Sequence, residues 1–227
     1  LHAPAPCTFG LAAQYHAASF GWEAVLPGPA EDVLAVAFRG DAPPQRDGYR
    51  VATIAPGRLS RPFEGNVVAI GEAAAEIGPL GCLSFSLALR QIVLLLGLLP
   101  SLPLEPLLAE EFNRRATQMM DNARDFVSLP DRLRGMGLDG PELLPTVSQF
   151  ARRGRLPHRG EDMVPDAAWT RMLLGLGVRP SRADPIALSV SPAEAATLLA
   201  RRRAEAAALV TRMPPYADWL ACQRRPR

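Results

Sequence analysis

The sequence predicts an α/β protein of the α+β kind, with strands in its first third and helices after them. Short apolar runs at 24–26 and 33–38 are separated by Pro-Gly-Pro, a composition typical of strand–turn–strand units. Residues 107–127 repeat apolar side chains at helical spacing, which indicates a long amphipathic helix. A chain of 227 residues can bury one substantial core and carry a helical extension.

A ligand-contacting segment is expected between these two parts. After a possible third strand at 49–54, the apolar run 67–70 ends at Gly71, which is typical of a buried strand whose end can approach a ligand closely. The small residues that follow predict a helix over 72–98, interrupted near Pro79, whose first N–H groups would face an anionic or electron-rich group. The alternative is an ordinary crossover between a strand and a helix.

The remaining elements are predicted from Pro-rich and Gly-rich breaks in the sequence and from a helix-capping pattern. The Pro-rich stretch 100–106 predicts a connector, and 129–165 predicts loops around short helices. A short helix is expected at 169–175. Residues 191–194, Ser-Pro-Ala-Glu, have the order of a capping box, so a final Ala-rich helix should run to Met213.

Composition excludes several kinds of chemistry. All 25 basic residues are Arg, so the chain offers no lysine amine for a Schiff base or a P-loop. The net charge of +2 is too small to argue for nucleic acid or a membrane surface. Three cysteines without metal-ligand spacing favour a reducing, cytoplasmic setting and no metal site. The apolar tract 82–99 is broken by Arg90 and Gln91 and predicts a buried helix, not a membrane span.

Three further features have competing interpretations. The thiol of Cys82, near a helix N-terminus, is either a reactive group or, more commonly, a small buried apolar side chain. The run 201–203, Arg-Arg-Arg, points to different sides of a helix and favours a solvated face over a nucleic-acid site. His158 is assigned no role. The chain has no signal-peptide pattern. It begins with Leu1 and not with Met, which favours a fragment, a processed chain or a misplaced start.

Five segments, in the same order along the chain, resemble the C-terminal portion of FAD-dependent tryptophan halogenases. They are 21–27 (Gly-Trp-Glu-Ala-Val-Leu-Pro), 61–71 (Arg-Pro-Phe-Glu-Gly-Asn-Val-Val-Ala-Ile-Gly), 112–115 with 124–126, Trp169 with 173–180, and 213–219. The resemblance implies part of a glutathione-reductase-type FAD-binding fold. Residues 1–100 would form the C-terminal part of the FAD-binding sheet domain, and 101–227 a mostly helical substrate lobe.

The resemblance also implies cofactor, substrate and partners. FAD would be reduced by a flavin reductase, and the substrate would be an aromatic small molecule such as an indole. Nucleic acid and membrane are not expected as partners, whereas a homodimer or a protein partner is possible. The family's Gly-x-Gly-x-x-Gly fingerprint and its lysine precede the region that this chain matches.

The site residues are carried over position by position. Trp22 would lie on the substrate side, and Cys82 and Leu83 occupy the positions where the family seats halide with Ser-Thr. The FAD contacts implied by the resemblance are Gly65, Asn66, Gly71, Glu72, Ala73, Pro79 and Leu80.

The chain departs from the family where chemistry is expected. Gly81 stands at the position of the family's catalytic Glu, so no catalytic residue is assigned, and Ala24 replaces the second Trp of the first segment. The leading hypothesis is therefore a halogenase-like flavoprotein part that does not halogenate. The alternatives are a non-catalytic helical interaction module derived from a halogenase, and a flavin monooxygenase that does not use halide.

Overall fold

The computed structural model describes residues 2–5, 13–18, 20–26, 32–38, 50–99, 105–133 and 143–223. These residues group into two compact units. The sheet unit comprises Leu1–Thr53 with Val190–Arg227, and the helical unit comprises Ile54–Ser189. The predicted turn at 27–29, Tyr49 and most of the predicted connector at 100–106 lie outside the described residues. The division into lobes at residue 100 stays a prediction.

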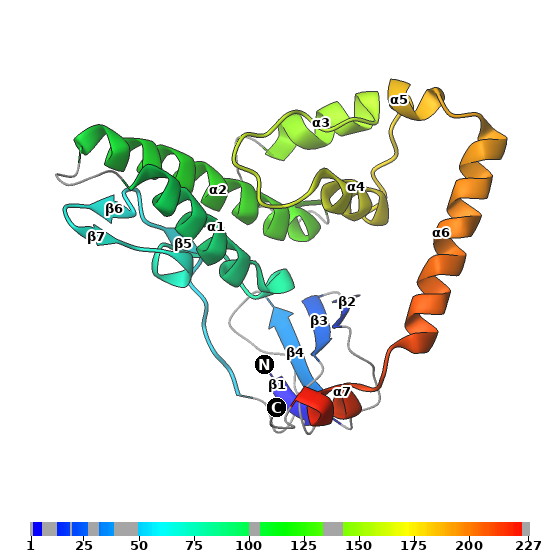
Figure 1. Ribbon diagram of the computed structural model, residues 1–227, viewed down its shortest axis with the longest axis horizontal. Helices are drawn as coiled ribbons and strands as arrows, with labels where there is room; N and C mark the ends of the chain where they lie inside the picture. The colour runs from blue at the N-terminus through cyan, green and yellow to red at the C-terminus, as the bar shows by residue number, and fades with distance from the viewer. Residues whose placement is uncertain are drawn as a thin grey trace. The chain divides into compact units, whose positions relative to one another are not determined.

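The sheet unit contains a four-stranded antiparallel sheet in the order β1-β4-β3-β2 (Figure 1). Its strands are β1 (His2–Ala5), β2 (Gln14–Ala18), β3 (Gly21–Leu26) and β4 (Asp32–Phe38). The predicted strands at 24–26 and 33–38 are confirmed as the paired β3 and β4, with Ala24 opposite Ala35 and Val25 opposite Leu34. Ala24 and Val36 are buried, because alternate residues of a strand face the same side.

Gly21 fixes the start of β3. Its φ is +153°, and a Cβ atom built there would lie 2.2 Å from the carbonyl oxygen of Ala37 on the neighbouring strand. No side chain fits at that distance, so the approach of β3 to β4 depends on glycine at this position.

The sheet unit also contains α6 (Pro192–Arg212) and α7 (Tyr216–Gln223). The predicted capping box is confirmed: the Ser191 hydroxyl accepts from the Glu194 N–H, and the Ser191 N–H donates to the Glu194 carboxylate. These bonds satisfy two N–H groups that a helix start otherwise leaves without acceptors.

The helical unit is built around two long helices, α1 (Leu83–Leu98) and α2 (Pro106–Leu133), which lie side by side above short antiparallel strand pairs (Figure 1). These pairs are β6 (Phe63–Glu64) with β7 (Val67–Val68), and β5 (Gly57–Arg58) with β8 (Ala75–Glu76). The core between them includes Leu87, Phe112 and Met120, and the rings of Phe63 and Phe112 meet edge to face at 5.8 Å.

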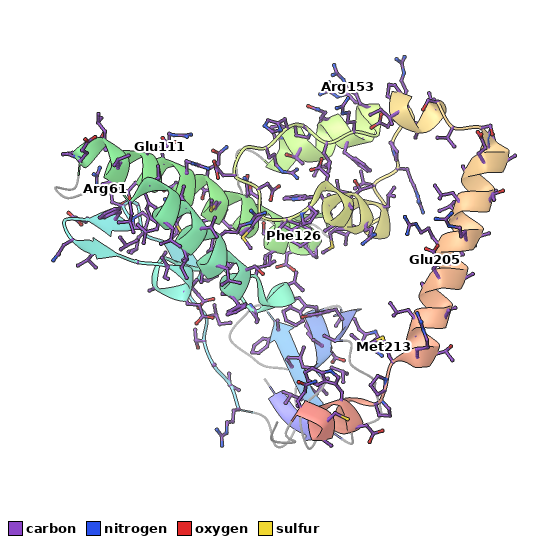
Figure 2. All side chains as sticks on the ribbon, in the orientation of Figure 1. Arg61, Glu111, Phe126, Arg153, Glu205 and Met213 are labelled. Atoms are coloured by element: carbon purple, nitrogen blue, oxygen red, sulfur yellow. The ribbon has the colours of Figure 1, made fainter. Side chains whose placement is uncertain are left out.

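A second core packs against the C-terminal part of α2. There α3 (Leu143–Arg153) and α4 (Asp166–Gly175) bury Leu129, Phe150, Trp169 and Leu173, and the short α5 (Pro185–Leu188) follows. Figure 2 shows Phe126 on α2 pointing into this region, where its ring lies 5.1 Å from that of Trp169. The helices predicted at 107–127 and 169–175 are confirmed, and α2 continues through Pro130 into a range that had been predicted as loops.

Other predictions are wrong in detail. Residues 50–54 form no strand, and the strand predicted over the apolar run 67–70 is reduced to Val67–Val68, with Val67 66% exposed. The helix predicted from residue 72 begins only at Leu83.

Glycine geometry explains the late start of α1. Gly71, Gly78 and Gly81 all have positive φ, and each interrupts the right-handed helical path. Two 3₁₀ turns, Gly71–Ala73 and Leu80–Cys82, and the short strand β8 therefore occupy this range.

Helix α1 is buried on one side only. Leu87 and Leu94 face the core, whereas Phe85, Val93 and Leu96 are more than half exposed. The prediction of a buried helix is thus confirmed for one side of α1 and wrong for the other. No helix within the described ranges combines the length and the apolar composition needed to cross a lipid bilayer.

Candidate functional site

The β6–β7 hairpin presents Gly65 and Asn66 at an exposed turn. Gly65 has φ +60°, and a Cβ atom built on it would meet nothing within 4 Å. The turn therefore carries an open, side-chain-free face to which another group can come close.

Asn113 on α2 holds this hairpin in place. The Phe63 N–H donates to Asn113 Oδ1 at 2.7 Å, and Asn113 Nδ2 donates to the Phe63 carbonyl oxygen at 2.9 Å. Asn113 is only 7% exposed, so both bonds satisfy groups that water does not reach. Nearby, Arg58 on β5 makes a bidentate ion pair with Asp121, also on α2, at 2.8 and 3.0 Å.

Gly71 is locked against α1. Its φ is +58°, and an added Cβ would lie 3.0 Å from the Cβ of Ala88. Its N–H donates to the side-chain oxygen of Gln91 at 2.7 Å, while the buried Nε2 of Gln91 has no acceptor among the described residues. The Gly71 N–H is therefore already used and does not face a ligand.

The turn after Gly71 differs from the predicted helix start. The N–H groups of Ala73 and Ala74 donate to Ile70 and Gly71 within the 3₁₀ turn. Both Glu72 and Ala73 are exposed, and within the described part of the chain the Glu72 N–H has no acceptor. The donor left available at this turn is thus the Glu72 N–H.

The segment from Glu76 to Leu83 is the last part of the candidate site along the chain. The Glu76 carboxylate accepts from the Gly78 N–H at 2.9 Å, a local bond that ties its Oε1 to the turn. Pro79 and Gly81 are exposed and Leu80 is half-buried. Gly81 has φ +70°, and a Cβ there would be 3.8 Å from Leu83, in ordinary contact. The backbone thus leaves room for a side chain where the sequence has none. The side chain of Cys82 lies outside the described residues.

The structure brings Gly65, Asn66 and the residues from Gly71 to Leu83 into one unit, whereas Trp22 lies in the other. Trp22 sits on β3 opposite Ala37, with its ring 5.8 Å from that of Tyr15. Its role beside a substrate stays a prediction.

Sequence reasoning missed the two side chains that hold the site, Gln91 and Asn113. The available signal was a polar residue on the apolar side of a helix: Gln91 lies between Leu87 and Leu94, and Asn113 follows Phe112. Among the described residues, no group of three or more His, Cys, Asp or Glu side chains is placed to hold a metal ion.

Comparison with solved structures identifies the class of protein. The chain superimposes on a flavin-dependent halogenase from Brevundimonas sp. BAL3 with a TM-score of 0.76 and 26% identity, over 97% of this chain and 50% of that one. A flavin-dependent halogenase from Xanthomonas campestris gives 0.76 and 25% with the same coverage. A tryptophan 6-halogenase from Streptomyces toxytricini gives 0.79 and 18%, over 97% and 50%.

The fold is thus half of a flavin-dependent halogenase fold, and the chain spans about half the length of these structures. The family model of tryptophan halogenases matches residues 29–192, which include the whole site segment. The chain belongs to the tryptophan halogenase family.

Proposed function

We propose that this chain forms the C-terminal half of a halogenase-like flavoprotein and that residues 65–83 lie against FAD. The single observation that carries the proposal is the open backbone of this segment within the family-matched region: Gly65 and Gly81 have positive φ and no crowded neighbours, so a planar cofactor can approach the main chain. The exposed Glu72 N–H and the Pro79–Leu80 turn fit the same role.

When bound, FAD supplies the redox chemistry, and the chain's own residues position it. Asn113 fixes the hairpin that carries Gly65, and Gln91 fixes Gly71. Both contacts hold the backbone in place before the cofactor arrives, which lowers the ordering cost of binding.

The exposed face of α1 supports the view that the fold continues beyond this half. Phe85, Leu89, Val93 and Leu96 follow helical spacing on the side opposite Leu87 and Leu94, and they are 71%, 49%, 64% and 65% exposed. A contiguous apolar face of this kind normally packs against another apolar protein surface. Because the matched structures are about twice as long, we propose that the other half of the halogenase fold covers it.

The FAD proposal is tested with one substitution at Gly65. The protein, produced from its complete reading frame, is desalted and its bound FAD measured by flavin absorbance. In Gly65→Asn, a side chain enters the open space, while asparagine tolerates positive φ, so the fold should be kept. We expect FAD affinity to fall about tenfold or more, a change of ~1.4 kcal/mol.

The matched control is Gly97→Ala. A Cβ atom at Gly97, on α1, meets nothing within 4 Å, and alanine favours the helix. FAD binding should be unchanged in this variant. Wild-type protein without FAD, or equal binding by the wild type and Gly65→Asn, would contradict the proposal.

We further propose that the protein does not halogenate. The position of the family's catalytic Glu holds Gly81, and the nearby Glu76 carboxylate accepts from the Gly78 N–H within its own turn. A general acid or base must come within hydrogen-bond reach of its proton, and Gly81 offers none. The FAD-loaded protein with a flavin reductase, NADH, halide and indole should give no chlorinated or brominated product; such a product would refute this part. Oxygenated indole in the same reaction would instead favour a monooxygenase.

A non-catalytic interaction module remains the second candidate, and the exposed α1 face is the observation that favours it. In that case the protein would retain no FAD but would form a stable dimer or hetero-complex through α1. Replacing Val93 and Leu96 by serine would then dissociate the complex, and light scattering would show the fall in molar mass.

A further inference from the structure

A cavity of about 320 Å³ lies in the helical unit, away from the segment proposed to contact FAD. Four parts of the chain meet around it: α2, the start of α3, the loop before α4, and α4 itself. Its walls include Asn122 and Asp125 on α2, Pro145 and Thr146 on α3, and Pro157 and Trp169. None of them belongs to the residues expected to contact flavin, halide or substrate.

The hydrogen-bond donors of Arg159 and Trp169 are sealed within the protein. Arg159 donates to Asp162 at 2.6 Å and lies 3.6 Å from the Asp166 carboxylate. Its terminal nitrogens and the Trp169 Nε1 are fully buried, so they present no surface to a molecule in the cavity. The two aspartates together carry one more charge than Arg159, which leaves negative charge in excess on this side of the cavity.

Asp125 offers an acceptor to the cavity. Its side chain is 7% exposed, and its Oδ1 accepts from the Nε and Nη2 of Arg124 at 3.0 and 2.8 Å. Its Oδ2 accepts from none of the described residues, yet it is not among their fully buried polar atoms. Because so little of Asp125 is exposed and the residue lines the cavity, we infer that this oxygen opens into it.

Asn122 adds a second acceptor beside the first. Its Nδ2 donates to the Gly160 carbonyl oxygen at 2.9 Å, which fixes the orientation of the amide. Its Oδ1 accepts from no residue that the structure describes, and Asn122 is 5% exposed. Residues three apart on a helix are neighbours, so an amide oxygen and a carboxylate oxygen lie on one face of α2 at the cavity.

The ion pairs around Asp125 leave its second oxygen without a cation. Arg124 is shared between Asp125 and Asp121, and Asp121 also pairs with Arg58 at 2.8 Å. These two arginines balance these two aspartates, and they reach Asp125 only through Oδ1. A little-exposed carboxylate oxygen without a donor costs free energy, which a ligand that brings N–H groups recovers.

From this arrangement we propose that the cavity binds the ammonium group of a small aliphatic amine. An ammonium carries three donors and a positive charge, and it matches a carboxylate oxygen beside an amide oxygen. Pro145 and Pro157 form apolar walls for a carbon chain. Trp169 is 1% exposed and the Arg159 guanidinium covers its ring at 4.0 Å, so the wall favours a slim chain over a stacked aromatic body. The proposal does not depend on bound FAD.

The test uses butylammonium as the probe, with 1-butanol and butyrate as its neutral and anionic counterparts of the same length. Binding is followed by NMR titration of the complete protein at neutral pH. We expect butylammonium to bind at least tenfold more tightly than either counterpart, and its chain to give nuclear Overhauser contacts with the Trp169 ring. Equal or tighter binding of 1-butanol or butyrate, or no contact with Trp169, would overturn the proposal.

Asp125→Asn keeps the shape of the side chain and removes its charge. It should weaken butylammonium binding about tenfold or more and leave 1-butanol binding unchanged. The matched control is Glu111→Gln, which removes another carboxylate of α2 that pairs with an arginine, Arg114, and does not line the cavity. This control should bind the probe as the wild type does.

Equal butylammonium affinity in the wild type and folded Asp125→Asn would contradict the proposal. If Asp125→Asn fails to fold, the comparison of the three probes and the ring contacts in the wild type still decide the question.

Discussion

Replacing Asn113 by alanine should loosen the hairpin that carries the proposed flavin contact at Gly65. Asn113 makes two hydrogen bonds to one residue, accepting from the Phe63 N–H at 2.7 Å and donating to the Phe63 carbonyl oxygen at 2.9 Å. Phe63 is itself buried at 6% exposure, so neither backbone group gains easy access to water once the amide is gone.

The size of the destabilisation follows from counting the backbone groups that lose their hydrogen-bond partner. A buried donor or acceptor left without a partner costs ~1–3 kcal/mol, and Asn113→Ala leaves one of each, so the loss is roughly 2–6 kcal/mol. Against a total stability of about 5–15 kcal/mol for a domain, this is a large fraction. Asn122→Ala, which removes a single bond to the Gly160 carbonyl, should cost less, about 1 kcal/mol.

Urea unfolding measures the free energy, and amide hydrogen exchange locates the effect. In Asn113→Ala the Phe63 amide should lose more protection than the amide of Ala123 in the middle of α2, because its acceptor is removed locally. FAD affinity should fall together with this protection. A loss of stability below about 0.5 kcal/mol, or equal changes in exchange at Phe63 and Ala123, would refute the reasoning.

Two further predictions concern the sheet unit. Gly21→Ala should destabilise the β3–β4 pairing severely, since its Cβ would lie 2.2 Å from the Ala37 carbonyl oxygen; thermal melts should show this, and an unchanged melting temperature would contradict it. The Ser191 hydroxyl, followed by the Ser191 N–H, lowers the pKa of the Glu194 carboxyl, so its contribution to the start of α6 is present above the unfolded-state pKa and is lost as the pH falls through the folded-state pKa. The protection factors of the first-turn amides of α6, which correct for the intrinsic pH dependence of exchange, should therefore fall in acid. Glu194→Gln should abolish this fall, and its persistence in Glu194→Gln would assign it to another group.

Local signals in the sequence sufficed where neighbouring residues determine the structure. The capping box at Ser191 and Glu194 involves residues three apart, and it predicted the start of α6 correctly. The apolar repeat of α2 and the paired strands β3 and β4 are likewise encoded by period and turn composition. The five family-like segments were also readable in order, and the family match confirms what they indicated.

The conformation of the site segment was decided by partners far away in the chain. The apolar run at 67–70 read as a buried strand, yet Val67 is exposed and only Val67–Val68 pair, because the hairpin partner is Phe63–Glu64. Ala75–Glu76 became a strand by pairing with Gly57–Arg58, where small residues after a glycine had indicated a helix. No local pattern contains these pairings.

The sequence by itself determined the family, a strand-rich first third followed by helices, and the absence of a carboxylate at Gly81 and of any lysine in this chain. Tertiary structure alone decided how the site is held and which residues line the cavity of the helical unit. Asn113 reaches Phe63 across 50 residues, and Gln91 reaches Gly71 across 20. Arg159 and Trp169 meet the α2 residues Asn122 and Asp125 at one cavity. Side chains distant in the chain become neighbours only when α1, α2 and α4 pack, and packing depends on which surfaces fit together rather than on any local run of residues.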